Sequence, residues 1–187
     1  LIALISMLVA LVAVCGNVYI GAQNKLVPYV VQVDKLGTAV ATSRADVARR
    51  PDDRVIQAQL ASFIEASRSI YTDAAAQNKQ IKVVYSMLRP KGASYNKMNS
   101  YYQKNNPFEK IGKETIRVKV TNIVSQTLDT WQVEWEEERF IKDVFISKEI
   151  YKGLFTVEQI EPTTEEAILN NPLGIFVKAF NYSKFIQ

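Results

Sequence analysis

Residues 116–136 read IRVKVTNIVSQTLDTWQVEWE and carry the clearest structural pattern of the chain. In its first part Ile116, Val118 and Val120 alternate with polar residues, and from Trp131 onward tryptophan and valine alternate with glutamine and glutamate. Because successive side chains of a strand point to opposite faces, this period-two alternation predicts two strands with one apolar face each. The link at residues 128–130 is short enough for a hairpin.

Two further strands are predicted downstream, over residues 148–161 and 175–186. Tyr151, Phe155 and Val157 fall on one face of the first of them. Consecutive strands with short links favour an antiparallel sheet, and the helical patterns lie upstream of it. Segregated helices and strands indicate an α+β domain, with the sheet curling over the helices.

Three helices are predicted before the sheet, over about residues 52–71, 81–88 and 95–105. Proline at position 51 and Asp52 and Asp53 suit the first turn of a helix. Apolar residues then recur at helical spacing. They are Ile56, Leu60, Phe63, Ile64, Ile70 and Tyr71 in the first helix, Val84 and Leu88 in the second, and Met98 and Tyr102 in the third. A strand is also predicted after Pro28, over residues 29–33.

The first charged residue of the chain is Lys25, and the run before it is apolar without helical periodicity. A helix over these residues would be about 30 Å long, which matches the hydrocarbon core of a bilayer. We therefore predict a transmembrane helix over residues 1–24, followed by one domain over residues 25–187. A cleaved signal peptide, a lipoprotein signal ending at Cys15 and a buried core helix are the alternatives, and the size of Val14 argues against lipidation.

The composition excludes several kinds of chemistry. The chain has no histidine and a single cysteine, Cys15, so a Cys/His zinc site, a histidine-dependent catalytic triad and an internal disulfide are ruled out. No phosphate loop or dinucleotide fingerprint is present. The net charge is +4, yet the lysines are dispersed, so direct nucleic-acid binding is disfavoured. No cofactor is predicted.

A run of glutamates ends the second strand of the hairpin: Glu134, Glu136, Glu137 and Glu138. Carboxylates in this number could hold a divalent cation. Alternation places Glu134, Glu136 and Glu138 on one face, where Arg117 and Lys119 of the neighbouring strand could pair with them. We favour this second interpretation, a solvated strand face.

The aromatic residues also allow two interpretations. Trp131 and Trp135 would serve either as a binding platform or as core packing, which we favour. Tyrosines near an acid could form a proton-transfer site, but no acid among the strands except Asp143 lies in a clearly apolar context, and we disfavour this interpretation. A related alternative function is a membrane-anchored binding domain for a small hydrophobic ligand, in a cavity lined by Tyr85, Tyr102, Trp135 and Phe155.

The turn at residues 170–174 precedes the last strand. Pro172 suits the second position of a β-turn, Gly174 can adopt positive φ, and Asn171 can bond the nearby backbone. The turn either sets the start of the last strand or forms a rigid, exposed recognition element.

These features together resemble the bitopic inner-membrane component of bacterial type IV secretion systems, the TrbF-like conjugal transfer family. The resemblance covers nearly the whole chain. It rests on the N-terminal anchor, the strand after Pro28, the helix-rich middle, the strand at residues 131–135, and the Asn-Pro-x-Gly motif, which Asn171, Pro172 and Gly174 match.

The resemblance implies a nuclear-transport-factor-two-like domain in the periplasm, held at the inner membrane by a single span. It also implies a non-enzymatic scaffold that self-associates and contacts other secretion subunits, with the bilayer contacted through residues 1–24. In this family the first long helix carries self-association contacts and the Asn-Pro-x-Gly turn is linked to assembly. The implied interaction residues are therefore Asn171, Pro172 and Gly174, with Gln57, Glu65 and Arg68 as outward-facing residues of the helix.

Overall fold

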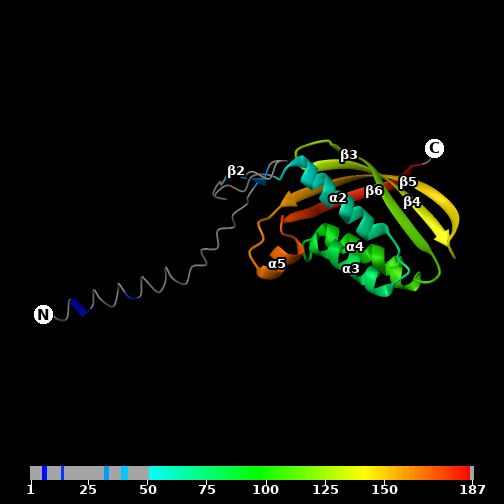
Figure 1. Cartoon of the computed structure of the whole chain (residues 1–187), viewed down its shortest axis with the longest axis horizontal. Helices are drawn as coiled ribbons and strands as arrows, with labels where there is room; N and C mark the ends of the chain where they lie inside the picture. The colour runs from blue at the N-terminus through cyan, green and yellow to red at the C-terminus, as the bar shows by residue number, and fades with distance from the viewer. Residues whose placement is uncertain (1–5, 8–13, 15–31, 34–38, 42–50, 186–187) are drawn as a thin grey trace. The chain divides into compact units, whose positions relative to one another are not determined.

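Four antiparallel strands form the sheet, in the order β3-β4-β5-β6 (Figure 1). They are β3 (Thr115–Ser125), β4 (Thr130–Ile141), β5 (Val144–Gln159) and β6 (Ile175–Phe185). The computed structural model describes residues 6–7, 14, 32–33, 39–41 and 51–185. The antiparallel order of these strands confirms the predicted sheet, and the presence of both helices and strands confirms the α+β class.

The chain divides into two units, Leu1–Arg49 and Arg50–Gln187. In the first unit β1 (Gln32–Val33) pairs antiparallel with β2 (Ala39–Ala41). The predicted helix over residues 1–24, its boundary with the following domain and Cys15 lie outside the described residues, apart from residues 6, 7 and 14. Among the residues that are described, no helix has the length and apolar character needed to cross a membrane.

Three helices of the second unit precede the sheet: α2 (Asp53–Arg68), α3 (Ala74–Ser86) and α4 (Ala93–Lys104). Each of the first two begins at an aspartate whose side chain accepts a backbone N–H, Asp52 from Arg54 and Asp73 from Ala76. A 3₁₀ turn, η1 (Pro107–Glu109), leads into β3, and a short helix, α5 (Glu165–Asn170), lies between β5 and β6. The helix-rich middle predicted from the sequence is confirmed.

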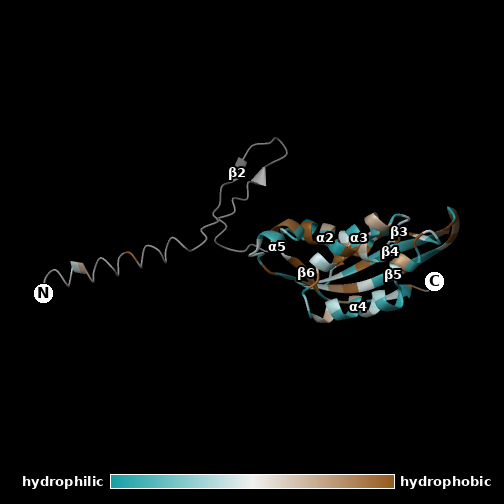
Figure 2. Cartoon of the chain, turned by 90° about the horizontal axis from the view of Figure 1, so that it is seen from below, coloured by the Kyte–Doolittle hydropathy of each residue, from teal (hydrophilic) through white to brown (hydrophobic). Residues whose placement is uncertain are grey.

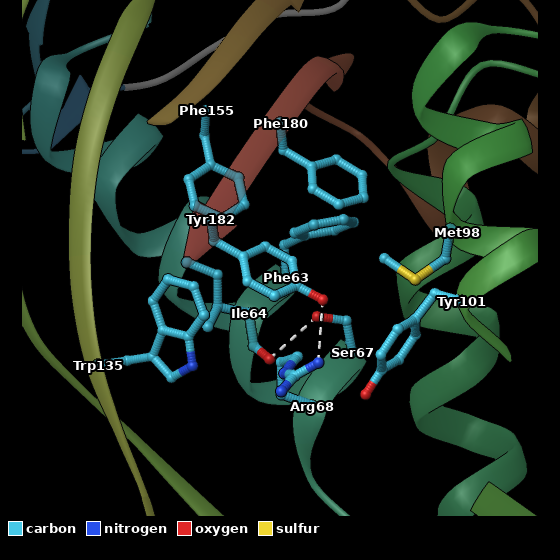
Figure 3. A pocket seen from close by; sticks show the side chains of 10 residues that line it. All are labelled: Phe63, Ile64, Ser67, Arg68, Met98, Tyr101, Trp135, Phe155, Phe180 and Tyr182. Atoms are coloured by element: carbon cyan, nitrogen blue, oxygen red, sulfur yellow. Dashed lines mark hydrogen bonds between the residues drawn. The ribbon is translucent and has the colours of Figure 1, made fainter. Parts of the chain in front are cut away.

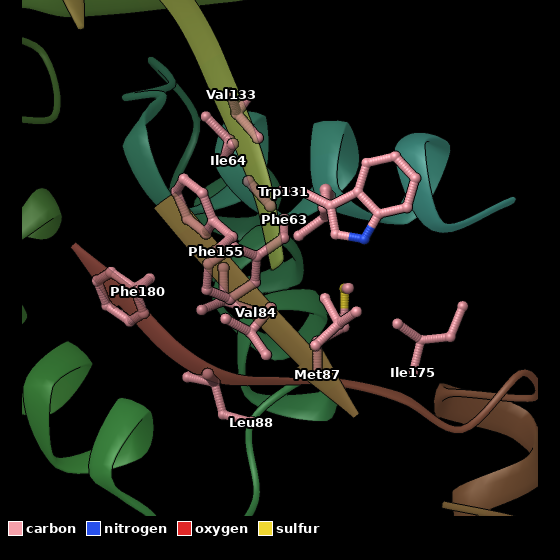
Figure 4. Packing of buried hydrophobic residues seen from close by; sticks show 14 of the residues in the cluster. Phe63, Ile64, Val84, Met87, Leu88, Trp131, Val133, Phe155, Ile175 and Phe180 are labelled. Carbon is pink, nitrogen blue, oxygen red and sulfur yellow. The ribbon is translucent and has the colours of Figure 1, made fainter. Parts of the chain in front are cut away.

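The sheet curves around the helices and its inner face packs on them (Figures 1 and 2). Trp131, Val133 and Trp135 of β4 are fully buried, as the alternation predicts, and both tryptophans belong to the core rather than to a binding platform. Figure 4 shows this core, where side chains of α2 and α3 meet those of the strands. It includes Phe63, Ile64, Val84, Met87, Leu88, Phe155, Ile175 and Phe180.

Two element starts differ from the prediction. α3 begins at Ala74 and not near residue 81, because the side chain of Asp73 caps it there. β5 begins at Val144, earlier than the predicted residue 148, because Lys142 and Asp143 adopt positive φ angles of 48° and 63° and reverse the chain within two residues. This tight turn pairs Ile141 with Val144, so the hairpin closes directly after β4.

Candidate functional site

Asn171 ties together three elements at the start of β6. Its side-chain Nδ2 donates to the carbonyl oxygens of Ser86, at 3.1 Å, and of Ile175, at 3.0 Å, while its Oδ1 accepts the backbone N–H of Ile175 at 3.3 Å. Ser86 ends α3 and Asn171 follows α5 directly. Asn171 is buried, with 6% of its surface exposed. Its amide therefore holds the turn to the helical layer and is not available to a partner.

Gly174 completes the turn from the opposite side. Its φ of +60° lies in the left-handed region, and its carbonyl accepts the backbone N–H of Ile160 at 2.8 Å. A Cβ at this position would overlap the carbonyl oxygen of Ile160. Glycine is required here by both the backbone conformation and the close approach of the end of β5.

The remaining residues of the turn face solvent. Pro172 is exposed and Leu173 is 39% exposed. We call the exposed apolar residues at this corner the turn patch: Ile160, Ile168, Leu169, Pro172 and Leu173. Each interpretation of the motif therefore fits two of its residues. Asn171 and Gly174 set the start of the strand, while Pro172 and Leu173 are exposed at the surface.

The three residues selected on α2 have different environments. Glu65 is exposed, whereas Gln57 is half-buried and its Nε2 donates to the carbonyl of Ile123 of β3 at 3.5 Å. Arg68 does not face outward as expected, because its side chain is only 12% exposed and points into the space between the helices and the sheet.

The guanidinium of Arg68 forms a two-point ion pair with Glu137 of β4. Its Nε lies 2.6 Å from Oε1 and its Nη2 lies 3.0 Å from Oε2. Its Nη1 donates to the hydroxyl of Tyr182 at 3.0 Å (Figure 3). Glu137 Oε1 also accepts the indole N–H of Trp135 at 2.8 Å. Both charged groups are thus buried and satisfied by each other and by their neighbours.

Three tyrosine rings surround the same guanidinium, those of Tyr101, Tyr151 and Tyr182, with centroids 5.0–5.2 Å from its central carbon. Burial opposes the charge of Arg68, yet the hydrogen bonds with Glu137 keep its pKa above the ordinary value. Burial also raises the pKa of Tyr101 to about 12. The cluster is therefore a buried ion pair enclosed by phenols whose pKa values burial raises.

The cavity beside this cluster has a volume of about 10 Å³, which is the space of a single water. Its lining includes Trp135 and Phe155, but Tyr85 and Tyr102 line a separate, open depression on the helical side. The four residues do not form one apolar cavity, so the alternative of a small hydrophobic ligand is not supported by the part of the chain that the structure describes.

The glutamate run of β4 divides between the two faces of the sheet. Glu134, Glu136 and Glu138 lie on the outer face and pair with Lys152, Lys148 and Arg117. Glu137 alone points inward, to Arg68. The solvated-face interpretation is confirmed for three of the four, with lysines of β5 as partners in place of the expected Lys119. Across residues 51–185 and the shorter described segments, no three metal-ligating side chains gather into a possible metal site.

Comparison with known proteins identifies the chain's relatives. A family model described as VirB8 protein matches residues 1–184. Conjugal transfer protein TrbF of Rhizobium radiobacter is 33% identical over 184 residues, covering 98% of this chain and 84% of that protein.

Solved structures share the fold. The soluble domain of TrwG from the type IV secretion machinery of Bartonella grahamii has a TM-score of 0.65 at 16% identity, over 74% of this chain and 98% of that one. VirB8 of Agrobacterium tumefaciens has a TM-score of 0.59 at 15% identity, over 74% and 99%. The sheet packed on helices thus matches the nuclear-transport-factor-two-like domain of VirB8 proteins. The expected resemblance is confirmed: this chain belongs to the VirB8 family.

Proposed function

We propose that this chain is a non-enzymatic scaffold subunit of a type IV secretion machine of the conjugation type. Residues 1–24 anchor it in the bacterial inner membrane, and residues 25–187 lie in the periplasm, where they contact other copies and other subunits. Membership of the VirB8 family and the identity with a conjugal transfer protein support this assignment.

The observation that carries the proposal is the turn patch. Leu169 is 77% exposed and Leu173 is 39% exposed, and both flank a turn that Asn171 and Gly174 hold rigidly from beneath. Exposed apolar groups on a fixed backbone lose little conformational freedom when a partner covers them. The turn patch is therefore suited to bind another subunit. Because the membrane raises the local concentration of subunits, a small interface of this kind suffices.

The buried charges support a structural role for the domain interior. Arg68 and Glu137 are the most enclosed ion pair of the described residues, and each is engaged by the other. Their charged groups are turned toward each other and away from the surface. The functional surface of the domain is accordingly its exterior, with Glu65 of α2 and the turn patch as the contact candidates.

The test is conjugal transfer in a strain that lacks the protein and is complemented with variants. Leu173→Ser and Pro172→Ala change only exposed positions of the turn, so the fold should persist while transfer falls. Leu154→Ser is the matched control, because Leu154 is 49% exposed on the outer face of β5. Asn171→Ala and Gly174→Val do not serve this purpose, since both disturb the packing of the turn itself.

Reduced transfer by Leu173→Ser and Pro172→Ala, at normal protein levels and with normal transfer by Leu154→Ser, is the expected result. Normal transfer by both turn variants would remove the turn patch from the mechanism.

A further inference from the structure

The turn between β4 and β5 carries an unusual set of exposed apolar side chains. We call residues 140–146 the hairpin tip. Ile141 is 38% exposed, Val144 63%, Phe145 55% and Ile146 49%. They flank the two-residue turn of Lys142 and Asp143. A solvent-facing hairpin end is normally polar, because the hydration of exposed apolar groups is unfavourable and such groups promote association.

The hairpin tip extends past its neighbours in the sheet. β3 begins at Thr115, which pairs with Phe140, and the described part of β6 ends at Phe185, which pairs with Ile150. Among the described residues, β5 before Ile150 is therefore paired with β4 alone. In Figures 1 and 2 this end of the hairpin lies beyond the ends of the helices. None of the described helices covers it.

Both faces of this two-stranded ribbon are apolar. Phe140 and Phe145 are register partners on one face, with ring centroids 5.8 Å apart. Ile141 and Val144 are register partners on the other face, since neighbouring residues of a strand alternate. A protein partner that docks on a sheet covers one face. An apolar medium that surrounds the ribbon covers both.

The exposed side chains of the hairpin tip offer an apolar surface that a bilayer can take up. The four exposed fractions correspond to roughly 400 Å² of apolar surface, about half of what each partner contributes to a standard protein interface. Interfacial segments of membrane-bound proteins bury their apolar groups about 5–10 Å into the boundary between headgroups and acyl chains.

The charges around the hairpin tip fit an anionic headgroup layer. Residues 139–148 contain three cations, of which Arg139 and Lys148 are paired with Glu114 and Glu136. Lys142 has no ion-pair partner among the described residues, and the guanidinium of Arg117 lies 4.8 Å from the ring centroid of Phe140. Long cationic side chains of this kind extend to the headgroups while their stems and neighbours stay in apolar surroundings.

From these observations we infer that the hairpin tip inserts into the surface of the lipid bilayer as a second, peripheral membrane contact of the domain. The inference rests on the proposed membrane location of the chain. It gives the domain a fixed orientation on the bilayer, with the free end of the β4–β5 hairpin directed at the lipid.

The experiment uses the full chain with Cys15→Ser and one new cysteine, labelled with a small fluorophore and reconstituted into vesicles of phosphatidylethanolamine and phosphatidylglycerol. Val144→Cys reports on the hairpin tip, and Ile146→Cys is a second label there if the first variant fails to fold. Leu128→Cys is the matched control, since Leu128 is a 74% exposed apolar residue in the loop at the other end of β4. Quenching by spin-labelled lipid and by aqueous iodide is compared at each position.

The label at the hairpin tip should be quenched by the spin-labelled lipid about threefold more than the label at residue 128, and should be protected from iodide. The proposal is wrong if the label at the hairpin tip is quenched by iodide and not by the spin-labelled lipid. It is also wrong if the label is shielded from both quenchers, since that result indicates a protein contact. If the chain floats with the vesicles in those cases, only the tip proposal fails. If it does not float, the membrane location fails together with it.

Discussion

Replacing Arg68 with methionine leaves the carboxylate of Glu137 buried without its cation. The two side chains are 12% and 8% exposed, so water cannot replace the lost partner. Breaking a buried pair in this way costs about 3–5 kcal/mol, which includes the desolvation of the remaining charge. We expect Arg68→Met to lower the free energy of unfolding by about 4 kcal/mol. For a unit of this size that corresponds to a decrease in Tm of about 12 °C.

The double variant Arg68→Met with Glu137→Gln should be the more stable of the two. The glutamine keeps an oxygen for the indole N–H of Trp135, which donates to Glu137 at 2.8 Å, and it removes the uncompensated charge. We expect it to recover about 2 kcal/mol relative to Arg68→Met. Arg117→Met is the control, because Arg117 is 70% exposed in its pair with Glu138 and such pairs contribute at most about 1 kcal/mol.

Thermal unfolding of the purified full chain, followed by near-ultraviolet circular dichroism, measures the Tm of each of the three variants relative to that of the unchanged chain. The reasoning fails if Arg68→Met is no more destabilised than Arg117→Met, or if the double variant is as unstable as Arg68→Met.

Three further predictions concern the turn, the phenols and one buried acid. Gly174→Ala should lower the free energy of unfolding by about 2–3 kcal/mol, because alanine at a φ of +60° is strained and its Cβ overlaps the carbonyl of Ile160; an unchanged urea midpoint would contradict this. Burial raises the pKa of Tyr101 to about 12. The contribution of its neutral phenol to the free energy of unfolding is therefore complete below about pH 10 and decreases as the pH rises toward 12. Absorbance at about 295 nm should therefore show a delayed class of tyrosines, and a single ionisation near pH 10 would be evidence against it. Burial opposes the charge of Glu114, yet hydrogen bonds from Lys110 and Arg139 hold its pKa below the ordinary value of 4.5. Its stabilisation is thus present above that pH and lost on acidification, so Glu114→Gln should show a smaller loss of stability between about pH 6 and pH 3 than the unchanged chain. Equal losses would contradict the assignment.

The strands could be predicted because their alternation reports burial directly. Trp131, Val133 and Trp135 occupy one face of β4 and are all buried. The alternation of apolar and polar residues in the sequence therefore follows directly from the burial of one face of the strand. The start of β5 could not be predicted in the same way. Val144, Phe145 and Ile146 are all apolar and exposed, which removes the alternation, and the preceding turn lacks the glycine that usually marks positive φ.

The role of Arg68 depends on a contact that no local pattern contains. An arginine on an amphipathic helix is assigned to solvent by default, and its partner Glu137 lies 69 residues away in the chain. One signal was present in the sequence. Glu137 lies two and six residues after Trp135 and Trp131, so it shares their face of the strand. It is therefore the one glutamate of its run that faces the core, where its charge requires a buried cation.

The turn at residues 171–174 shows a similar division. Proline and glycine could be assigned to a turn from their backbone preferences alone. The burial of Asn171 depends on the end of α3, which reaches the turn only in the folded domain. Sequence reasoning therefore located the motif correctly but could not separate its structural residues from its exposed ones.

A scaffold among secretion subunits should be recovered together with those subunits. The most direct measurement is purification of the tagged full chain from detergent-solubilised membranes of the transferring strain, with quantitative mass spectrometry of the proteins that accompany it. We expect recovery of other secretion subunits at a fixed ratio, reduced by Leu173→Ser and unchanged by Leu154→Ser. A chain that is recovered alone, as a stable monomer and at normal abundance, would contradict it.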